Sequence, residues 1–511
     1  QAALVVDDGV LAIEDLLAAI GVDALATLSF SGPETALVIG GVADLGQRGL
    51  ARLEIRDGAL GTIEQSLRLG IESGGAGSID LVGAQTTMVA SSELTIGLDG
   101  EGELELRAGA TAVTRGPTVI GAGRGAGVVL LHDAGSLWHA EGPVAAGLSG
   151  VAGIAIGNGA VWSTGAEVTL GAAPGAHAQM SLDAAEWTVG GPLHLGAGGI
   201  AEVEVTDALV SVAGDLHLAA DASAATMLRL DGPSTRMRIA GGLRTGRGRT
   251  DVGVTDGAWL VVHEDLRLGE NEGDADVMLR DPGSLVVADG RLALGIDGAA
   301  SIDFGPDTVV SGSAVDIGCD GVWRGLGRAV GPITCRGIIE MSARRDATLR
   351  VADDLVLTSD ARLLVHVGSD DQGVVLAPVV ASAAVTLGGT LIVEFAPAFD
   401  VGTTMRVPLL YAPVILGAFD AIEIGTTPGG MSARLETYDD RLEIVLERTG
   451  VIPVDLDGNG VVDERDLALW LAGAAGRSDV RGDFSGDGRL DGADVDLMVR
   501  HWTPPGGIEP K

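Results

Sequence analysis

The sequence contains very few aromatic residues and almost no lysine. Phe, Tyr and Trp together make up 3% of the 511 residues, and Lys511 is the only lysine. With 71 acidic residues against 33 basic ones, the net charge is −38, which excludes the broad basic surface that binds nucleic acid. No apolar run reaches the roughly 18 residues of a membrane-spanning helix, so we expect no membrane span. The excess of carboxylates suits divalent cations.

The chain is instead rich in small and aliphatic residues. Glycine occurs 80 times, and hydrophobic residues make up 46% of the sequence. This composition excludes global disorder and is sufficient for a large core. Abundant Gly with Val, Leu, Ile and Ala is typical of many short strands joined by tight turns.

A short apolar segment that usually ends in glycine recurs at intervals of roughly 25 residues. The segments end at Gly40, Gly70, Gly97, Gly121, Gly147, Gly171, Gly196, Ala219, Gly246, Gly269, Gly295 and Gly318. Two further alternating segments, such as 203–205 and 210–212, give each unit three short strands. Three such strands bury their apolar faces only when copies stack. We therefore predict a right-handed parallel β-solenoid, because the blades of a competing β-propeller need about 40 residues.

Two columns of equivalent residues follow from this repeat. Trp138, Trp162 and Trp187 each lie nine residues before the terminal glycine of three consecutive units. They form either an exposed ladder that binds sugars or an interior stack, and the apolar residues at this place in other units favour the stack. His194 and His217 also share one place in adjacent units, and we expect them to stack on the outer surface.

The two ends of the solenoid need covers, because open sheet edges are exposed there. Residues 1–27 are predicted to form an N-terminal cap, with a helix over 11–20 preferred to a first irregular strand. The solenoid is predicted over 28–375. Longer strands joined by Pro and Gly turns predict a small antiparallel β end domain over 376–450.

Cysteine occurs twice, at Cys319 and Cys335, a spacing that places the two on adjacent turns. In a secreted protein we expect them to form a disulfide, and two buried thiols are the alternative. The first residues, Gln1-Ala2-Ala3-Leu4, suggest a chain from which a signal peptide has been removed before Gln1.

Two segments near the C-terminus, 455–466 and 483–494, match a twelve-residue calcium loop. Gly460 and Gly488 stand at the sixth position, where such a loop turns sharply. The oxygen ligands are predicted at Asp455, Asp457, Asn459, Val461, Asp463 and Asp466, and at Asp483, Ser485, Asp487, Arg489, Asp491 and Asp494. Val461 and Arg489 would contribute backbone carbonyls. An apolar helix is expected after each loop.

Residues 451–503 resemble a type I dockerin, because both loops end in Asp rather than Glu and no helix precedes the first. The resemblance implies two bound Ca²⁺ ions and docking onto a cohesin module in an extracellular assembly. It places partner contacts at Glu464, Arg465, Gly492 and Ala493, which differ from the Ser/Thr pairs of cellulosomal dockerins. We therefore expect the partner to be a cohesin-like module or a neighbouring copy of the chain, with 451–511 forming the docking module.

The repeats, such as LTIGLDGEGELELRAGA, resemble those of autotransporter-like and exosortase-sorted (PEP-CTERM-associated) bacterial surface proteins. Solenoid lyases and hydrolases need a basic residue beside acidic calcium ligands, or clustered Asp residues. The Asp pairs of this chain fall near its ends and turns, so no catalytic residue is predicted. The sequence favours a non-catalytic extracellular or cell-surface rod, structural or adhesive, that assembles through calcium-dependent docking, including as a fibre subunit. The alternative is a β-helix protein that binds or degrades polysaccharide, with a surface or matrix glycan as ligand.

Overall fold

The fold was determined as a computed structural model. It describes residues 2–342, 348–370, 373–375, 377–396, 405–427, 431–448, 454, 456–457, 462–476, 492–500 and 502. The chain divides into two compact units, Gln1–Ile338 and Ile339–Lys511.

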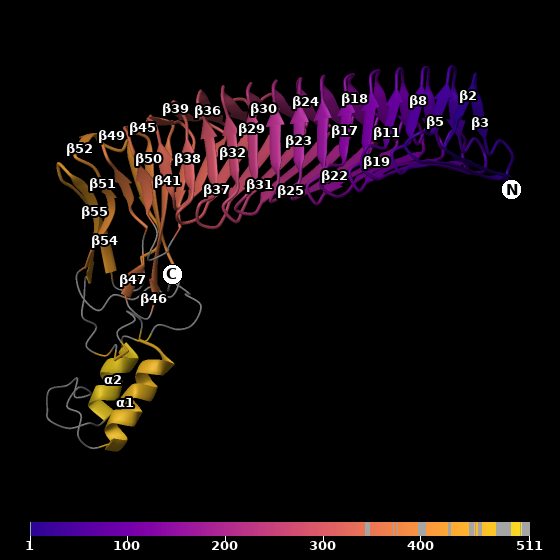
Figure 1. Cartoon of the computed structure of the whole chain (residues 1–511). Coiled ribbons are helices and arrows are strands. Elements are labelled where there is room, and N and C mark those ends of the chain that lie inside the picture. The colour runs from indigo at the N-terminus through magenta and orange to yellow at the C-terminus, as the bar shows by residue number, and fades with distance from the viewer. Residues whose placement is uncertain are drawn as a thin grey trace. The chain divides into compact units, whose positions relative to one another are not determined.

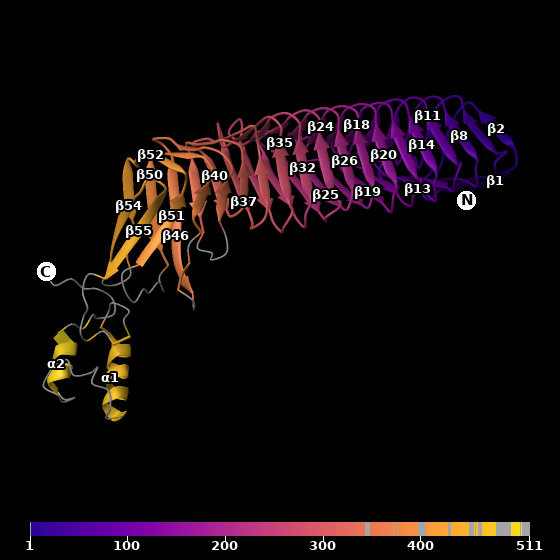
Figure 2. The same ribbon diagram turned by 60° about the vertical axis from the view of Figure 1, so that its left-hand side comes forward.

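In Gln1–Ile338, each turn of the chain contributes one strand to each of three walls (Figures 1 and 2). Wall A begins with β1 (Ala2–Asp7), wall B with β2 (Val10–Ile13) and wall C with β3 (Leu16–Ala18). Each wall then contains every third strand, and the last strands of the three walls in this unit are β40 (Gly321–Gly325), β41 (Arg328–Val330) and β42 (Ile333–Cys335). Strands of successive turns pair in parallel, as β10 (Ala76–Val82) does with β13 (Glu101–Arg107). The predicted parallel β-solenoid is confirmed, with about 15 turns in the described residues.

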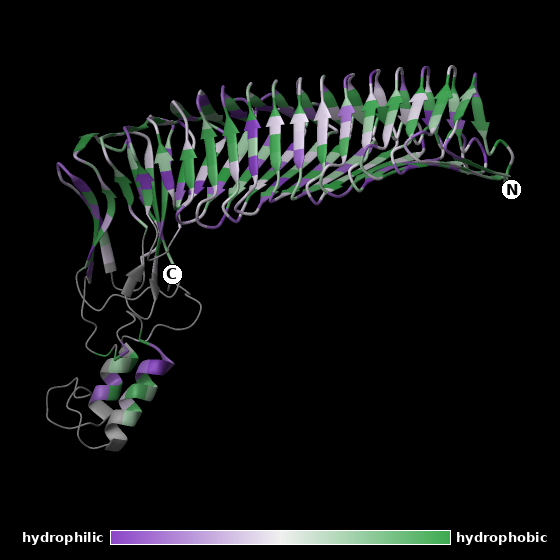
Figure 3. Cartoon of the chain, in the orientation of Figure 1, coloured by the Kyte–Doolittle hydropathy of each residue, from purple (hydrophilic) through white to green (hydrophobic). Residues whose placement is uncertain are grey.

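Buried and more exposed residues alternate along most of the wall strands. Hydrophobic and hydrophilic positions are both seen on the strands when the cartoon is coloured by hydropathy (Figure 3). In β19 (Val151–Gly157), Ala152, Ile154 and Ile156 are buried, and the residues between them point outward. Because successive turns pair without a shift in register, inward residues of one turn contact inward residues of the next. Each buried Ile or Leu stabilises the fold by about 1.5–3 kcal/mol, so the stacked turns share one continuous core.

Glycines after the wall C strands explain the repeat seen in the sequence. Gly97 follows β12 (Leu94–Ile96) with a φ of 72°, a left-handed conformation that residues with a Cβ adopt at a cost. A Cβ atom at Gly97 would lie 2.1 Å from the carbonyl oxygen of Ala126 in the next turn. Both the backbone conformation and the close approach of neighbouring turns therefore require glycine here.

The first repeat glycine is not the one that the sequence indicated. Gly40 follows β5 (Ala36–Ile39), which is a wall B strand, and its φ is not positive. The corresponding corner is Gly46, with a φ of 73°, after the wall C strand β6 (Ala43–Leu45). The interval from Gly40 to Gly70 is longer than the others because Gly40 is not the residue equivalent to Gly70.

The helix predicted over residues 11–20 is wrong. This segment forms β2 and β3, whose residues pair in parallel with the next turn, Leu11 opposite Leu37 and Ile13 opposite Ile39. The apolar residues fit both patterns, but the strand conformation also gives the backbone hydrogen bonds to a neighbouring turn. Pairing with that turn therefore outweighs helix propensity.

In the unit Ile339–Lys511, parallel pairing continues beyond residue 375. β48 (Val379–Ala381) pairs in parallel with β44 (Leu349–Val351) and β51 (Met405–Tyr411), and β50 (Thr390–Phe395) with β46 (Arg362–Asp370) and β53 (Ala421–Ile424). The predicted boundary at 376 is therefore too early. An antiparallel end sheet is present, but it consists of β51, β54 (Met431–Thr437) and β55 (Arg441–Arg448).

Two helices follow, α1 (Glu464–Gly476) and α2 (Gly492–Arg500). Both lie after the predicted calcium loops, where the sequence placed apolar helices. Among the described residues, no helix combines the length and the apolar character needed to cross a membrane.

Candidate calcium-binding segment and surface sites

Asp466, the last ligand predicted in the first calcium loop, is fully buried in the first turn of α1. One of its carboxylate oxygens accepts the backbone N–H groups of Leu456 at 2.7 Å and Asp457 at 3.0 Å. The other accepts the backbone N–H of Asp463 at 2.9 Å. This one carboxylate therefore connects the beginning and the end of the predicted loop.

Asp463 caps the start of α1. Its side-chain Oδ1 accepts the backbone N–H of Arg465 at 2.7 Å, and its carbonyl oxygen accepts the N–H of Leu467 at 3.2 Å. Short side chains with an oxygen favour this position, because they satisfy N–H groups that have no partner within the helix. Asp463 and Asp466, at positions nine and twelve of the predicted loop, therefore hold the backbone at the start of α1.

The two helices share a small apolar cluster. It consists of Val454, Val462, Trp470 and Met498, with Leu456, Leu467, Val495 and Trp502 packed against it. Leu467, Trp470, Val495 and Met498 of the two helices thus face this cluster, whereas Leu471 and Val499, at 54% and 61% exposure, face the solvent. Asp494 at the start of α2 is fully buried like Asp466, so the two repeats are alike in this respect.

The remaining predicted ligands lie outside the described residues. These are Asp455, Asn459, Val461, Asp483, Ser485, Asp487, Arg489 and Asp491. Of the predicted docking residues, Glu464 and Arg465 are exposed in the first turn of α1, and Gly492 and Ala493 begin α2. In the part of the chain that the structure describes, no group of three or more His, Cys, Asp or Glu side chains converges on one point. The donors present are carboxylates, the hard oxygen ligands that Ca²⁺ prefers.

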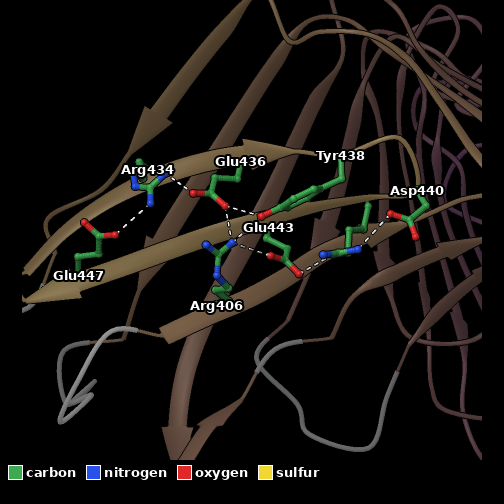
Figure 4. Close-up of polar contacts among 8 residues, drawn as sticks. Arg406, Arg434, Glu436, Tyr438, Asp440, Glu443 and Glu447 are labelled. Carbon is green, nitrogen blue, oxygen red and sulfur yellow. Dashed lines mark hydrogen bonds and ion pairs between the residues drawn. The ribbon is translucent and has the colours of Figure 1, made fainter.

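A network of charged side chains covers one face of the antiparallel end sheet (Figure 4). Arg406 of β51 contacts both Glu436 of β54 and Glu443 of β55, and Tyr438 donates to Glu436 at 2.5 Å. The hydrogen bond from Tyr438, followed by that from Arg406, lowers the pKa of Glu436 to about 2. Arg406 and Arg434 are about half exposed, whereas Glu443 is buried. Because these ion pairs are partly screened by solvent on the arginine side, the network mainly sets the pairing of the three strands.

The tryptophan column is an interior stack. Trp138, Trp162 and Trp187 are fully buried, and their rings are parallel with centroids 5.0 and 5.2 Å apart. The interpretation as an exposed sugar-binding ladder is therefore wrong. The inward column of wall B continues through the buried Val286 and Val310, which pair with each other.

His194 and His217 stack on the outer face of wall C, as predicted, with ring centroids 4.8 Å apart and an angle of 7° between the rings. Burial, and then the neighbouring His217, lower the pKa of His194. Both effects disfavour the charged form of the ring.

No disulfide joins Cys319 and Cys335, so the predicted bond is absent from this structure. Cys335 is an inward residue of β42, opposite Ile317 of β39 (Ala314–Ile317), whereas Cys319 is exposed beyond the end of β39. The two side chains thus lie on opposite sides of the wall. Burial raises the pKa of the Cys335 thiol to about 12, which makes it a poor nucleophile.

One surface feature escaped the sequence analysis. Trp259 of β32 (Trp259–Val262) points outward with 38% of its surface exposed, and the Arg236 guanidinium lies 3.9 Å from its ring centroid. The two residues are direct neighbours on wall B. Trp259 lies ten residues before Gly269, whereas the inward residues of this column lie nine residues before their glycine. This difference of one residue was the sequence signal that Trp259 faces outward.

Comparison of the chain with models of known protein families and with curated proteins found no match in either case.

Proposed function

We propose that the chain is a non-catalytic structural or adhesive protein of the cell exterior, a β-solenoid that is attached or assembled through a C-terminal, dockerin-like module that binds two Ca²⁺ ions. The observation that carries this proposal is the buried carboxylate of Asp466, which accepts three backbone N–H groups from both ends of an acidic twelve-residue segment. A random acidic turn would leave its carboxylates in solvent.

Each calcium loop would supply oxygen ligands, and each bound ion would neutralise part of a dense cluster of Asp residues. In the first loop, Asp457 and Asp463 would be direct ligands, while Asp466 would hold the loop closed from the helix side. Bound Ca²⁺ would then lower the repulsion among these carboxylates. The helix pair would be ordered more firmly, since both loops end at the start of a helix.

A protein partner is the proposed target of the module. Leu471 and Val499 occupy corresponding places in the two repeats, and both expose most of their apolar side chain. Exposed apolar residues beside exposed Glu464 and Arg465 are typical of a surface that another protein covers. The proposed partner is a cohesin-like module or a neighbouring copy of this chain.

Isothermal titration of the full chain with Ca²⁺ tests the metal sites. We expect two ions per chain for the parent protein and one for the D457N/D463N variant. A D221N/D256N variant, which removes two exposed carboxylates from solenoid turns, is the matched control and should still bind two. Unchanged stoichiometry in D457N/D463N, or no binding by the parent, would refute the proposal.

Sedimentation velocity separates the two kinds of partner. Self-assembly predicts association of the pure chain when Ca²⁺ is added and dissociation when EDTA removes it. A monomer that binds two Ca²⁺ ions would leave the metal sites in place and would contradict the neighbouring copy as partner.

A further inference from the structure

One segment of the solenoid, about one repeat unit long, is rich in arginine. Between residues 229 and 249, six of the 33 basic residues of the protein occur within one repeat unit, in a chain of net charge −38. We call this group the arginine belt, and it consists of Arg229, Arg236, Arg238, Arg244, Arg247 and Arg249. Colouring by hydropathy shows hydrophilic positions on β29 (Arg236–Ile239) beside the apolar β32 (Figure 3).

Three exposed arginines of the belt have no ion-pair partner among the described residues. Arg229 contacts Glu204 at 3.5 Å and Arg249 contacts Asp251 at 3.2 Å, so these two charges are partly neutralised. Among the described residues, none forms a hydrogen bond or an ion pair with the side chains of Arg238, Arg244 or Arg247. Such a group of uncompensated like charges is costly within the fold and favours an anionic ligand.

The three unpaired arginines lie on consecutive parts of the same turn. Arg238 projects from β29 of wall B, Arg244 from β30 (Leu243–Thr245) of wall C, and Arg247 stands at the next corner. The corner between the first two is made by Gly241 and Gly242, where the Asp215 carboxylate of the preceding turn accepts the backbone N–H of Gly242 at 2.8 Å. Positive charge therefore follows the circumference of the solenoid across two walls, which suits an extended polymer better than a small anion.

An apolar platform adjoins these charges on wall B. The Arg236 guanidinium stacks on the ring of Trp259, and Leu209, 49% exposed, lies opposite Arg236 on the other side. Trp259 is partly exposed, whereas the other tryptophans of the wall strands are fully buried, namely Trp138, Trp162, Trp187 and Trp323. A flat, partly apolar surface next to unpaired cations matches a ring that carries a carboxylate.

We propose that the arginine belt binds an acidic polysaccharide, a polymer of sugar rings with carboxylate groups. The rings would pack against Trp259 and the carboxylates would pair with Arg238, Arg244 and Arg247. A nucleic acid is disfavoured, because its dense phosphates would meet the strongly acidic remainder of the chain. This proposal does not depend on the calcium-binding module and assigns a ligand to a different part of the molecule.

Calorimetric titration of the full chain with polygalacturonate, in EDTA and at low salt, tests the proposal. EDTA removes Ca²⁺, so failure of the calcium-dependent docking leaves this result unaffected. We expect binding that weakens as salt rises, because the Debye screening length shortens. The R238Q/R244Q/R247Q variant should lower the affinity by about tenfold or more, while W259A should lower it without changing its salt dependence.

The control variant R124Q/R328Q/R336Q removes three exposed arginines that lie outside the belt, and it changes the net charge equally. It should change the affinity less than about twofold. Thermal unfolding of every variant establishes that the solenoid is intact. Three results would overturn the assignment to an acidic polysaccharide. These are no binding by the parent protein, equal losses of affinity in the belt and control variants, and equally strong binding of polyglutamate or single-stranded DNA.

Discussion

In the turns of Gln1–Ile338, backbone groups form hydrogen bonds to neighbouring turns, and apolar side chains pack in continuous columns. In the described residues between 454 and 502, by contrast, the buried carboxylate of Asp466 accepts three backbone N–H groups. The first region repeats the same contact many times, so each turn has two similar neighbours. The second has a small apolar cluster and many carboxylates. Regular stacking needs no ligand, whereas a loop of carboxylates is stabilised by a cation.

This difference predicts which changes affect which region. Changes to inward or corner residues of the solenoid should lower its stability and leave Ca²⁺ binding unchanged. Changes to the loop carboxylates should do the reverse. Single substitutions in each region test this separation, beginning with the largest expected effect.

Replacement of Trp162 by alanine should destabilise the solenoid most. Its ring is fully buried between those of Trp138 and Trp187, so the change removes two stacking contacts and leaves a cavity. We expect a loss of about 3–5 kcal/mol in the free energy of unfolding, measured by urea denaturation with far-UV circular dichroism. Trp259→Ala, at an exposed position, is the control and should cost less than about 1 kcal/mol. Equal effects would contradict the interior stack.

Replacement of Gly97 by alanine should cost more than about 2 kcal/mol. The left-handed backbone conformation accounts for about 1–2 kcal/mol, and contact of the new Cβ with the backbone of Ala126 adds to it. Gly74→Ala is the matched control, because Gly74 has a φ of 84° and a Cβ added there would meet no atom within 4 Å. Thermal unfolding of both variants measures the difference, and a smaller loss for Gly97→Ala would argue against tight contact between turns.

Replacement of Asp466 by alanine should disrupt the helix pair locally. Three backbone N–H groups lose their acceptor, at a cost of about 1–3 kcal/mol. Amide hydrogen exchange should show lost protection in α1 and α2 and none in the solenoid turns. Glu464→Gln, which alters an exposed carboxylate in the same helical turn, should leave the exchange unchanged. Loss of protection throughout Gln1–Ile338 would show that the two regions unfold together.

The smallest effect concerns the pH dependence of the antiparallel end sheet. The pKa of Glu436 is lowered from its ordinary value of 4.5 to about 2, so its charged contacts stabilise the fold above pH 4.5. This contribution is lost as the pH falls from about 4.5 to about 2. The melting temperature of Glu436→Gln should therefore lie slightly below that of the parent at pH 6 and match it at pH 2. Glu423→Gln, outside the network, should show no such convergence.

The sequence was sufficient to predict features that depend on the repeat. The stacked turns, the inward tryptophans and the outward histidine pair all follow from residues recurring at one place in each unit. The sequence pattern led to two wrong predictions. It took Gly40 as the first repeat glycine, and it favoured a helix over residues 11–20, where the apolar residues fit both a helix and strands. Local patterns do not contain the hydrogen bonds to the next turn, which decide both cases.

Features that depend on side-chain direction were harder to predict. The spacing of Cys319 and Cys335 fits adjacent turns, but a disulfide needs both side chains on the same side of the wall. The Arg236–Trp259 pair requires knowledge of the register between two turns. In residues 455–466, the sequence predicts calcium ligands from the spacing of the Asp residues, and that stays a prediction. The role of Asp466 in joining the two ends of this segment became visible only in the structure.

Matching register between neighbouring turns has a consequence for how this molecule can change over generations. A duplication or loss of one whole repeat unit would leave every remaining turn with a neighbour that it already fits, as Trp138, Trp162 and Trp187 illustrate for one column. Length is therefore a property that mutation can alter in steps of one repeat unit, while a shift of one residue within a strand would exchange the inward and outward side chains of that strand.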